Sequence, residues 1–399
     1  MGLPTALLLS NAGHKVLGYD IDEKKLDLLR AGNLPFEEKG LRKLFKKVKS
    51  NIDFVSTLHK SDVYIVTVPT PLTNDKKCDL SFVKSAVKKI SNVIEDGNLV
   101  IIESTVSPGV TEKVVKPLLD KSNKKYFLSF ASEKAIPGDT LYEMQNNNRI
   151  IGGINKESAN KAKEIYSSFV KSDIFLTDCN TAEIVKLMEN TFRDVNIALA
   201  NEFAKISKEF NIDIWEAIKL ANKHPRVNIH KPGPGVGGHC ISIDPWFLLT
   251  KNSDIVLKAR EINDSMPNYV FKFLKDLTTH IKNPVVTVFG VAYKGNVDDT
   301  RESPTITFIE ICLKEGFKVR LFDPYVKDFK YELVSIDEAT KGSDCIVIIT
   351  DHDEFKKINP NSLNMRNLNV FDTRNIIDPD KWKKAGFNVK LLGYNKLDR

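Results

Sequence analysis

A glycine-rich loop carries the side chain best suited to covalent chemistry. Its sequence is PGPGVGGHCISIDP (residues 232–245), and Cys240 lies just beyond its last glycine, between His239 and Asp244. Glycine allows positive φ and close approach of a ligand, and such loops offer N–H groups to a phosphate or sugar. A thiol with ionisable neighbours is typical of a nucleophile, with a buried cysteine at a tight turn as the alternative. We therefore predict a nucleophile at Cys240, served by the glycines Gly233, Gly235, Gly237 and Gly238.

A second segment, AEIVKLMENTFRDVNIALANE (182–202), is predicted to be helical and mostly apolar. Lys186 and Asn190 are spaced i, i+4, and Arg193 continues the same face. This polar stripe predicts the lining of a site, and a solvated helix face is the alternative. The residues assigned to packing on other faces are Ile184, Leu187, Met188, Val195 and Leu199.

Two further segments carry charged side chains at loops. Glu133 follows the expected strand YFLSF, and an exposed loop acid is the alternative interpretation there. Lys294 and Arg301 lie in GVAYKGNVDDTRESPT (290–305), before a helix that should open at Ser303 and Pro304. Basic residues at a helix N-terminus suit a phosphate group.

Composition narrows the class of protein. The chain has 399 residues, of which 42% are hydrophobic and 28% charged, as in folded globular domains. It has no uninterrupted apolar run long enough to span a bilayer, and we expect no membrane association and a cytoplasmic location. The net charge of +7 suits an anionic substrate, but the lysines are dispersed, so no nucleic-acid partner is expected. Five scattered cysteines without a CxxC pair predict neither a metal site nor a disulfide framework.

Strands and helices alternate at both ends of the chain, which predicts parallel sheets covered on both faces. A long helix at 181–209 and another at about 254–281 lie between them. The expected fold is α/β, with two Rossmann-like doubly wound domains joined by the long central helix. The predicted domains are a Rossmann-like nucleotide-binding domain at 1–177, a helical domain at 178–282, and a second Rossmann-like nucleotide-binding domain at 283–399.

The start of the chain predicts an incomplete nucleotide-binding motif. Such a fold opens with a strand, then GxGxxG, then a helix, and here Gly2 stands where the third glycine belongs. We therefore expect the first strand to be missing, its neighbours to lack a ladder partner, and the natural chain to start upstream. Asp20 ends a strand at the distance typical of the acid that binds ribose, and NAD is favoured over NADP. Asp323 ends a strand in a similar context, where ribose binding and a turn before Pro324 are both possible.

Six ordered blocks of sequence resemble the UDP-glucose/GDP-mannose dehydrogenase family over nearly the whole length. They are GLPTALLLSNAGHKVLGYDID, TVPTPL, ESTVSPGVT, KLMENTFRDVNIALANE, PGPGVGGHCISIDP and AYKGNVDDTRESP. Two of them most resemble the members that oxidise UDP-N-acetyl-D-mannosamine. UDP-glucose dehydrogenases typically carry Ser before the cysteine and Lys-Asp after it, where this chain has His239 and Ile243-Asp244.

The resemblance implies oxidation of a sugar C6 alcohol to an acid with two NAD⁺. An aldehyde has no second hydride to give until a nucleophile adds to its carbon, and Cys240 would add to form a thiohemiacetal and then a thioester. The resemblance further implies catalytic roles for Lys186, Asn190, Asp244 and Glu133, with Glu133 as the base for hydrolysis.

The remaining roles that the resemblance implies concern ligands and partners. It implies NAD binding by the domain at 1–177, dimerisation and catalysis by the domain at 178–282, and UDP binding by the domain at 283–399. Cofactor contacts are assigned to Gly2, Asp20, Pro69, Thr70, Thr105 and Arg301, and UDP-sugar contacts to Arg193, Arg226, Gly235, Gly237, Gly238, His239 and Lys294. Arg226 would reach the substrate of a neighbouring subunit in a homodimer or larger homo-oligomer. Three alternatives stay open: a UDP-glucose dehydrogenase, a two-electron hydroxyacid dehydrogenase, and a UDP-sugar-binding remnant without turnover.

Overall fold

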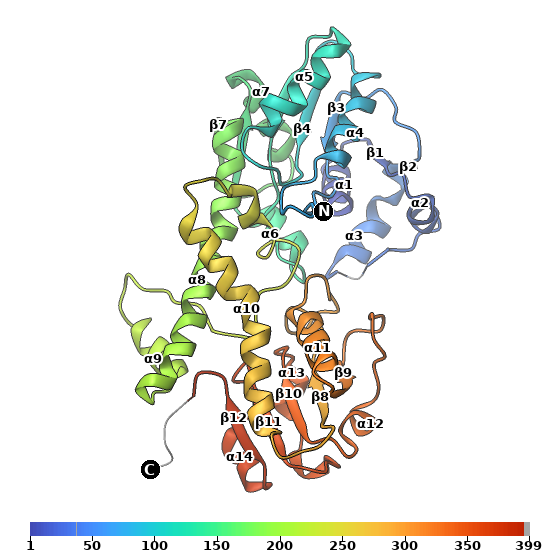
Figure 1. The fold of residues 1–399 in the computed structure, drawn as a ribbon. Helices are drawn as coiled ribbons and strands as arrows, with labels where there is room; N and C mark the ends of the chain where they lie inside the picture. The colour runs from blue at the N-terminus through green and yellow to red at the C-terminus, as the bar shows by residue number, and fades with distance from the viewer. Residues whose placement is uncertain (37, 395–399) are drawn as a thin grey trace. The chain divides into compact units, whose positions relative to one another are not determined.

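The computed structural model describes residues 1–36 and 38–394, which form two compact units. The first unit comprises residues 1–189 and 246–248, and the second comprises 190–245 and the chain from 249 onward (Figure 1). Helix α8 (Cys179–Phe210) runs across the boundary at residue 189. The division into three domains at 1–177, 178–282 and 283–399 stays a prediction.

The first unit contains two sheets. In the smaller, β1 pairs with β2 in parallel, and the larger has the strand order β3-β4-β5-β6-β7. In the usual order of a dinucleotide-binding sheet, β1 and β3 would flank one further strand, and among the described residues no strand joins the two sheets. The strands are β1 (Val16–Tyr19), β2 (Ile52–Val55), β3 (Val63–Val66), β4 (Leu99–Ile102), β5 (Phe127–Phe130), β6 (Arg149–Gly153) and β7 (Ile174–Asp178).

One strand pair departs from the expected parallel arrangement. β6 runs antiparallel to β5, with Ser129 opposite Gly153 and Phe130 opposite Gly152. The other pairs of this sheet are parallel. Because β6 reverses direction, it begins at the edge of the sheet where β5 ends. The first residue of β6, Arg149, is thereby brought to the loop that follows β5.

Helices cover both faces of the larger sheet, as a doubly wound fold requires. Along β4 the side chains alternate between two hydrophobic clusters, with Val100 and Ile102 in one and Leu99 and Ile101 in the other. Helices α4 and α5 contribute to the first cluster and α1, α6 and α7 to the second. The helices of this unit are α1 (Gly2–Asn11), α2 (Glu23–Arg30), α3 (Leu41–Val48), α4 (Ser81–Ser91), α5 (Lys116–Leu119), α6 (Thr140–Asn146) and α7 (Lys156–Ser167).

The second unit contains a fully parallel sheet of order β12-β11-β10-β8-β9. Its strands are β8 (Val285–Phe289), β9 (Lys318–Phe322), β10 (Cys345–Ile348), β11 (Asn369–Asp372) and β12 (Asn388–Leu391). Its helices besides α8 are α9 (Ile214–Ala221), α10 (Asp254–Leu277), α11 (Pro304–Lys314), α12 (Ile336–Thr340), α13 (Asp353–Lys357) and α14 (Pro379–Lys384). The predicted cap is confirmed, since the Ser303 side chain accepts the N–H of Thr305 and Pro304 opens α11.

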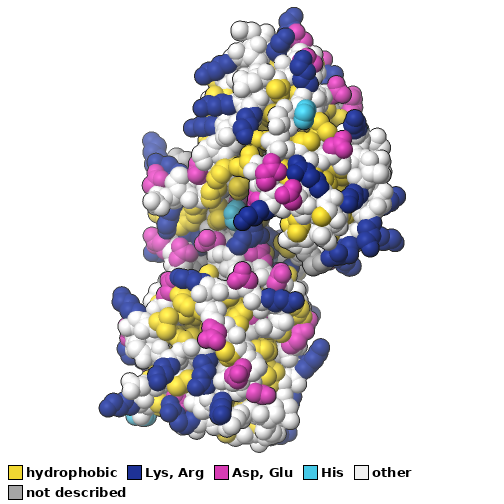
Figure 2. All heavy atoms as spheres, turned by 90° about the vertical axis from the view of Figure 1, so that its right-hand side faces the viewer, with side chains coloured by type: hydrophobic (Ala, Val, Ile, Leu, Met, Phe, Trp, Pro, Cys, Tyr) yellow, Lys and Arg dark blue, Asp and Glu magenta, His cyan; other side chains and the backbone are white. Residues whose placement is uncertain are grey.

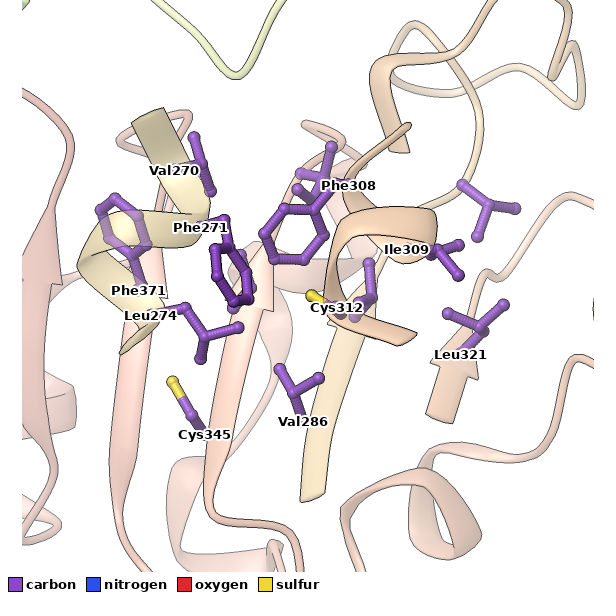
Figure 3. Close-up of a cluster of buried hydrophobic side chains, with 14 of the residues drawn as sticks. Val270, Phe271, Leu274, Val286, Phe308, Ile309, Cys312, Leu321, Cys345 and Phe371 are labelled. Carbon is purple, nitrogen blue, oxygen red and sulfur yellow. The ribbon is translucent and has the colours of Figure 1, made fainter. Parts of the chain in front are cut away.

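The core of this sheet packs against α10 and α11 on one face. Figure 3 shows Phe271 and Leu274 of α10 beside Phe308 and Cys312 of α11, above strand residues such as Val286. Phe308 is fully buried. A second cluster, built on Phe355 and Trp382, covers the opposite face.

Charged side chains are spread over the face of the molecule that Figure 2 shows. On the face in Figure 2, lysines and arginines are scattered among acidic and neutral atoms. None of the helices in the described part of the chain combines the length and the apolar composition needed to cross a membrane.

The core next to α11 provides a stability prediction. Phe308→Ala removes a fully buried ring and should lower the free energy of unfolding by about 3–5 kcal/mol. Denaturant unfolding measures this value, with Leu313→Ala as the control because Leu313 lies on the same helix and is 46% exposed. The control should change stability by less than about 1 kcal/mol. Equal losses in the two variants would contradict the packing described for α11.

Candidate active site

Residues from three predicted segments meet at the carboxyl ends of β3, β4 and β5. The Thr70 hydroxyl donates to the carbonyl of Thr105 at 2.7 Å, and the Thr105 and Ser132 hydroxyls are 3.2 Å apart. Pro69 directly precedes Thr70. Parallel α/β sheets bind ligands at this edge, so the placement of these side chains fits a cofactor and substrate site.

Glu133 lies in the same loop as Ser132 and is buried, so its interpretation as an exposed acid is wrong. It forms an ion pair with the buried Arg149. Its Oε1 also accepts the backbone N–H groups of Lys134 and Ala135, at 2.7 and 3.0 Å. Sequence reasoning missed Arg149, because nothing in its local sequence shows that β6 runs back toward β5.

Gly2 and Asp20, which are predicted to hold the dinucleotide, lie at the start of α1 and directly after β1. A Cβ placed on Gly2 would lie 2.5 Å from the Thr67 hydroxyl, so only glycine allows α1 to approach the chain after β3 this closely. Close packing of helix against strand is the role of the third glycine in the dinucleotide-binding motif. Asp20 follows the last residue of β1 and accepts the N–H of Asp22 at 3.0 Å, and a carboxylate at this place suits a ribose hydroxyl.

Helix α8 carries the polar stripe predicted from the sequence. Lys186 and Asn190 are both 7% exposed, so a solvated face is the wrong interpretation for these two residues. Arg193 is exposed. The apolar residues Ile184, Met188 and Leu199, assigned to packing, are 39%, 56% and 41% exposed instead.

Asn190 and the cysteine loop come together in the second unit. The Asn190 side-chain amide donates to Asp244 Oδ2 at 2.6 Å. The backbone N–H of Asp244 in turn donates to the carbonyl of Cys240 at 2.8 Å, in a tight turn. These bonds connect the helix to the loop that carries the sulfur.

Cys240 is the exposed cysteine of the five, all of which are described. Burial raises the pKa of the Cys179, Cys312 and Cys345 thiols and keeps them protonated. Cys240 and Tyr293 both act electrostatically on Arg301. An exposed thiol can reach a substrate carbon, so Cys240 is the cysteine among these that best suits a nucleophile.

Arg301 and His239 complete the surroundings of the sulfur. Arg301 donates from Nη2 to Asp299 Oδ2 at 2.6 Å, and chiefly this hydrogen bonding raises the pKa of its guanidinium. Burial, and next the charge of Arg301, lowers the pKa of His239, so its imidazole is neutral at pH 7. A neutral imidazole can accept or donate a hydrogen bond without adding charge to the site.

The glycines before Cys240 pack against protein atoms. A Cβ on Gly237 would lie 2.6 Å from the Glu302 carbonyl oxygen, and one on Gly238 would lie 2.8 Å from the Tyr293 ring. Gly238 also has φ +84° and donates its N–H to the carbonyl of Arg301. A Cβ on Gly235 would meet Pro304 at 2.9 Å. The ligand contacts assigned to these glycines stay predictions, while their need for glycine is explained by this packing.

A buried polar network anchors the start of the same loop and was not foreseen. The N–H of Gly233 donates to Asn201 Oδ1 at 2.8 Å, and the Asn201 amide donates to Asn263 Oδ1 at 2.9 Å. Asn263 donates to Asp194 Oδ1, which also accepts from Arg260 at 2.6 Å. Paired asparagines on two mostly apolar helices are the signal that could have revealed it.

The remaining predicted residues lie on loops of the second unit. Lys294 is exposed in the loop that follows β8, and Arg226 is exposed close to His224. Asp323 accepts four backbone N–H groups and is 3.1 Å from His352 Nε2, so the structure supports its interpretation as a turn residue. Arg374, which sequence reasoning missed, would contact any Cβ placed on Gly233.

A doubly wound unit with a strand-terminal acid, and a second unit with a reactive cysteine on a glycine loop, define a dinucleotide-dependent dehydrogenase. Three family models match the chain: the UDP-glucose/GDP-mannose dehydrogenase family NAD binding domain at residues 1–170, central domain at 180–266 and UDP binding domain at 287–379. The chain belongs to this family and is an NAD-dependent nucleotide-sugar dehydrogenase.

Relatives and solved structures support this assignment. A UDP-N-acetyl-D-mannosamine dehydrogenase of Methanococcus maripaludis is 50% identical over 98% of this chain and 95% of its own length. The structure of the UDP-D-ManNAc dehydrogenase of Pyrococcus horikoshii is 40% identical, with a TM-score of 0.93 over 99% of this chain and 97% of that one. The UDP-N-acetyl-mannosamine dehydrogenase of Staphylococcus aureus is 39% identical, with a TM-score of 0.90 over 98% and 96%.

The packing of Gly238 against Tyr293 provides a prediction for the loop. Gly238→Ala should lower dehydrogenase activity by on the order of 10²-fold, because the added Cβ displaces the loop two residues before the sulfur. Steady-state NADH production measures the loss.

Gly316→Ala is the matched control, since Gly316 has φ +83° but nothing within 4 Å of an added Cβ. The control should lose about 1–2 kcal/mol of stability and keep its activity. Full activity in the Gly238 variant would contradict the steric account.

Proposed function

We propose that this chain oxidises UDP-N-acetyl-D-mannosamine at C6 to UDP-N-acetyl-D-mannosaminuronate, with two NAD⁺ per sugar. Five relatives that are 48–50% identical over 98–99% of the chain carry the name UDP-N-acetyl-D-mannosamine dehydrogenase. The observation that carries the proposal is the exposed Cys240 in the turn that Asp244 and Asn190 hold. The His239 and Ile243-Asp244 pattern around the sulfur favours this sugar over UDP-glucose.

A nucleophile at Cys240 explains how the alcohol is oxidised by four electrons, two to each NAD⁺, to give the acid. NAD⁺, when bound, accepts a hydride in each of the two oxidations. The Cys240 thiolate adds to the aldehyde carbon and forms a thiohemiacetal, whose carbon again bears a hydrogen that can leave as hydride. The product of that second oxidation is a thioester on the sulfur. Water adds to its carbonyl carbon, the C–S bond breaks, and the acid leaves.

The neighbouring side chains stabilise and move charge in these steps. Lys186 stabilises the oxyanion that forms when sulfur or water adds to the carbonyl. Asn190 positions that oxygen or a water molecule, and Asp244 orients the Asn190 amide through the 2.6 Å bond. Glu133 is the base that takes a proton from the hydrolytic water.

The binding roles in this proposal are those that the resemblance to the family assigns. The dinucleotide is assigned to Gly2, Asp20, Pro69, Thr70, Thr105 and Arg301, and the UDP-sugar to Arg193, Arg226, Gly235, Gly237, Gly238, His239 and Lys294. Cations such as Lys294 suit the diphosphate. A cytoplasmic location, where NAD is available, suits this chemistry.

A homodimer formed through α8 is part of the proposal. Six apolar residues on this helix are exposed, at spacings of four and seven that keep them on one helix face: Ile184, Met188, Phe192, Leu199, Ile206 and Phe210. Met188 and Phe192 are 56% and 61% exposed. An exposed apolar stripe of this length is typical of a protein–protein contact.

The substrate is tested by incubating the chain with NAD⁺ and a panel of UDP-sugars. UDP-N-acetyl-D-mannosamine should be the preferred substrate and should give two NADH per acid. A preference for UDP-glucose would reject the proposed sugar, and one NADH per product would reject the covalent mechanism.

The role of the sulfur is tested by substitution. Cys240→Ala should abolish acid formation, because no adduct can form on the aldehyde. Product analysis by mass spectrometry measures the acid, with Cys78→Ala as the control because Cys78 lies outside the glycine loop. Wild-type acid yield from the Cys240 variant would exclude it as the nucleophile.

The oligomeric state is tested on the α8 face. Replacing Met188 and Phe192 together by Glu should convert a dimer to a monomer, because two charges would be buried at the contact. Light scattering after gel filtration measures the mass. Ile255→Glu is the control, since Ile255 is 73% exposed on α10 and lies outside the α8 face. An unchanged mass in the double variant would place the contact elsewhere.

A further inference from the structure

Three charged side chains form a buried cluster where β4, β5 and β6 meet. Arg149 pairs through Nη2 with Glu133, and its Nη1 lies 3.4 Å from Oε1 of Glu103. The three side chains are 5% exposed or less. The guanidinium carbon lies 4.2 Å from the ring centre of Tyr166. One cation is therefore shared by two carboxylates in a place that water hardly reaches.

The two carboxylates are held very differently. Glu133 has, besides Arg149, two backbone N–H donors at 2.7 and 3.0 Å. Among the hydrogen bonds of the described residues, Glu103 has only Arg149 at 3.4 Å and the Thr5 hydroxyl, which is 3.2 Å from Oε2. A carboxylate that served only to anchor the fold would be expected to use short bonds and backbone donors. Glu103 is thus a poorly anchored acid beside a well-anchored one.

The charge balance of the cluster depends on Glu103. Burial raises the pKa of Glu103 to about 7, against the opposing charge of Arg149 and with a further contribution from Glu133. The Thr5 hydroxyl also favours its ionised form. Burial holds the pKa of Tyr166 far above neutrality, so this phenol does not exchange protons here. Near pH 7 the cluster can therefore gain or lose one proton at Glu103.

The state of Glu103 changes how strongly Arg149 holds Glu133. When Glu103 is protonated, the whole charge of the guanidinium acts on Glu133. When Glu103 is ionised, the two carboxylates compete for one cation. Without Arg149, the Glu133 carboxylate would be buried with no opposite charge beside it.

We propose that Arg149 and Glu103 are positioning residues for thioester hydrolysis: Arg149 keeps the Glu133 carboxylate ionised and oriented, and Glu103 shares the guanidinium so that Glu133 stays basic. The inference rests on the proposed function, in which Glu133 activates the water. Glu133 takes one proton from that water, and the oxygen bonds to the thioester carbon. The C–S bond breaks, the Cys240 thiolate and the carboxylic acid are released, and the proton passes from Glu133 to solvent.

The experiment measures hydrolysis of the adduct on Cys240 in single turnovers, over about pH 6 to 9. The full chain is mixed with UDP-N-acetyl-D-mannosamine and NAD⁺, quenched at intervals, and examined by intact mass. The variants are Arg149→Met, Arg149→Lys and Glu103→Gln, with Glu133→Gln as the reference for loss of the base, about 10²–10⁴-fold.

The two charge-removing variants should move the pH profile in opposite directions. Arg149→Met should slow hydrolysis about tenfold or more at neutral pH, accumulate the adduct, and recover activity at higher pH. Glu103→Gln should lower the pH at which hydrolysis is half-maximal, because a weaker base is ionised at lower pH. It should also lower the maximal hydrolysis rate several-fold, because a weaker base accepts a proton less readily. Arg149→Lys, which keeps the cation, should restore part of the loss.

Glu183→Gln is the matched control. Glu183 is a buried acid of the same unit that accepts the N–H groups of Gly109 and Thr111. It should lower the unfolding temperature and leave the pH profile and the adduct fraction unchanged.

The outcomes separate this inference from the function on which it rests. A wild-type chain that makes two NADH per acid, together with Arg149 and Glu103 variants whose profiles are unchanged or shift in one common direction, overturns this inference alone. A wild-type chain that makes no acid from any UDP-sugar overturns the proposed function and this inference with it.

Discussion

A charge that is buried in a protein needs an opposite charge or hydrogen-bond partners beside it, and the ionisable residues of this chain are arranged by that requirement. In the first unit, Arg149 supplies the opposite charge for both Glu133 and Glu103. In the second unit, Arg260 and Asn263 donate hydrogen bonds to the fully buried Asp194, and Arg260 also supplies the opposite charge. Because removing one partner leaves the other charge uncompensated, each network fixes the segments that carry its members.

The topology of the first sheet decides which residues can share such a network. β4 and β5 are parallel, so the residues after them, including Thr105 and Glu133, emerge at one edge of the sheet. β6 is antiparallel to β5 and therefore begins at that same edge with Arg149. A parallel β6 would have placed its first residue at the opposite edge, and Glu133 would have needed another cation.

The cysteine loop of the second unit is held at two points by buried hydrogen bonds. Its first glycine is held through Asn201 and Asn263, and its turn is held through Asp244 and Asn190. Between these anchors, Gly237 and Gly238 fit against Glu302 and Tyr293 with no room for a side chain. A rigid frame around an exposed thiol suits a nucleophile that must meet a carbonyl carbon in one orientation.

The class of fold and the family could be predicted from the sequence alone, and Cys240 could be singled out as the candidate nucleophile, because these inferences depend on local patterns: strand–helix alternation, and glycines next to Cys240. It also placed Lys186 and Asn190 on one helix face, since helical periodicity is a local property. Only the tertiary structure decided that Glu133 is buried, that Arg149 links it to Glu103, and that Asp323 accepts N–H groups both from its own turn and from the segment after β8. Those facts depend on which strands lie side by side and in which direction they run. Arg149 is 16 positions from Glu133 and 46 positions from Glu103, so no local sequence pattern indicates that these residues pair.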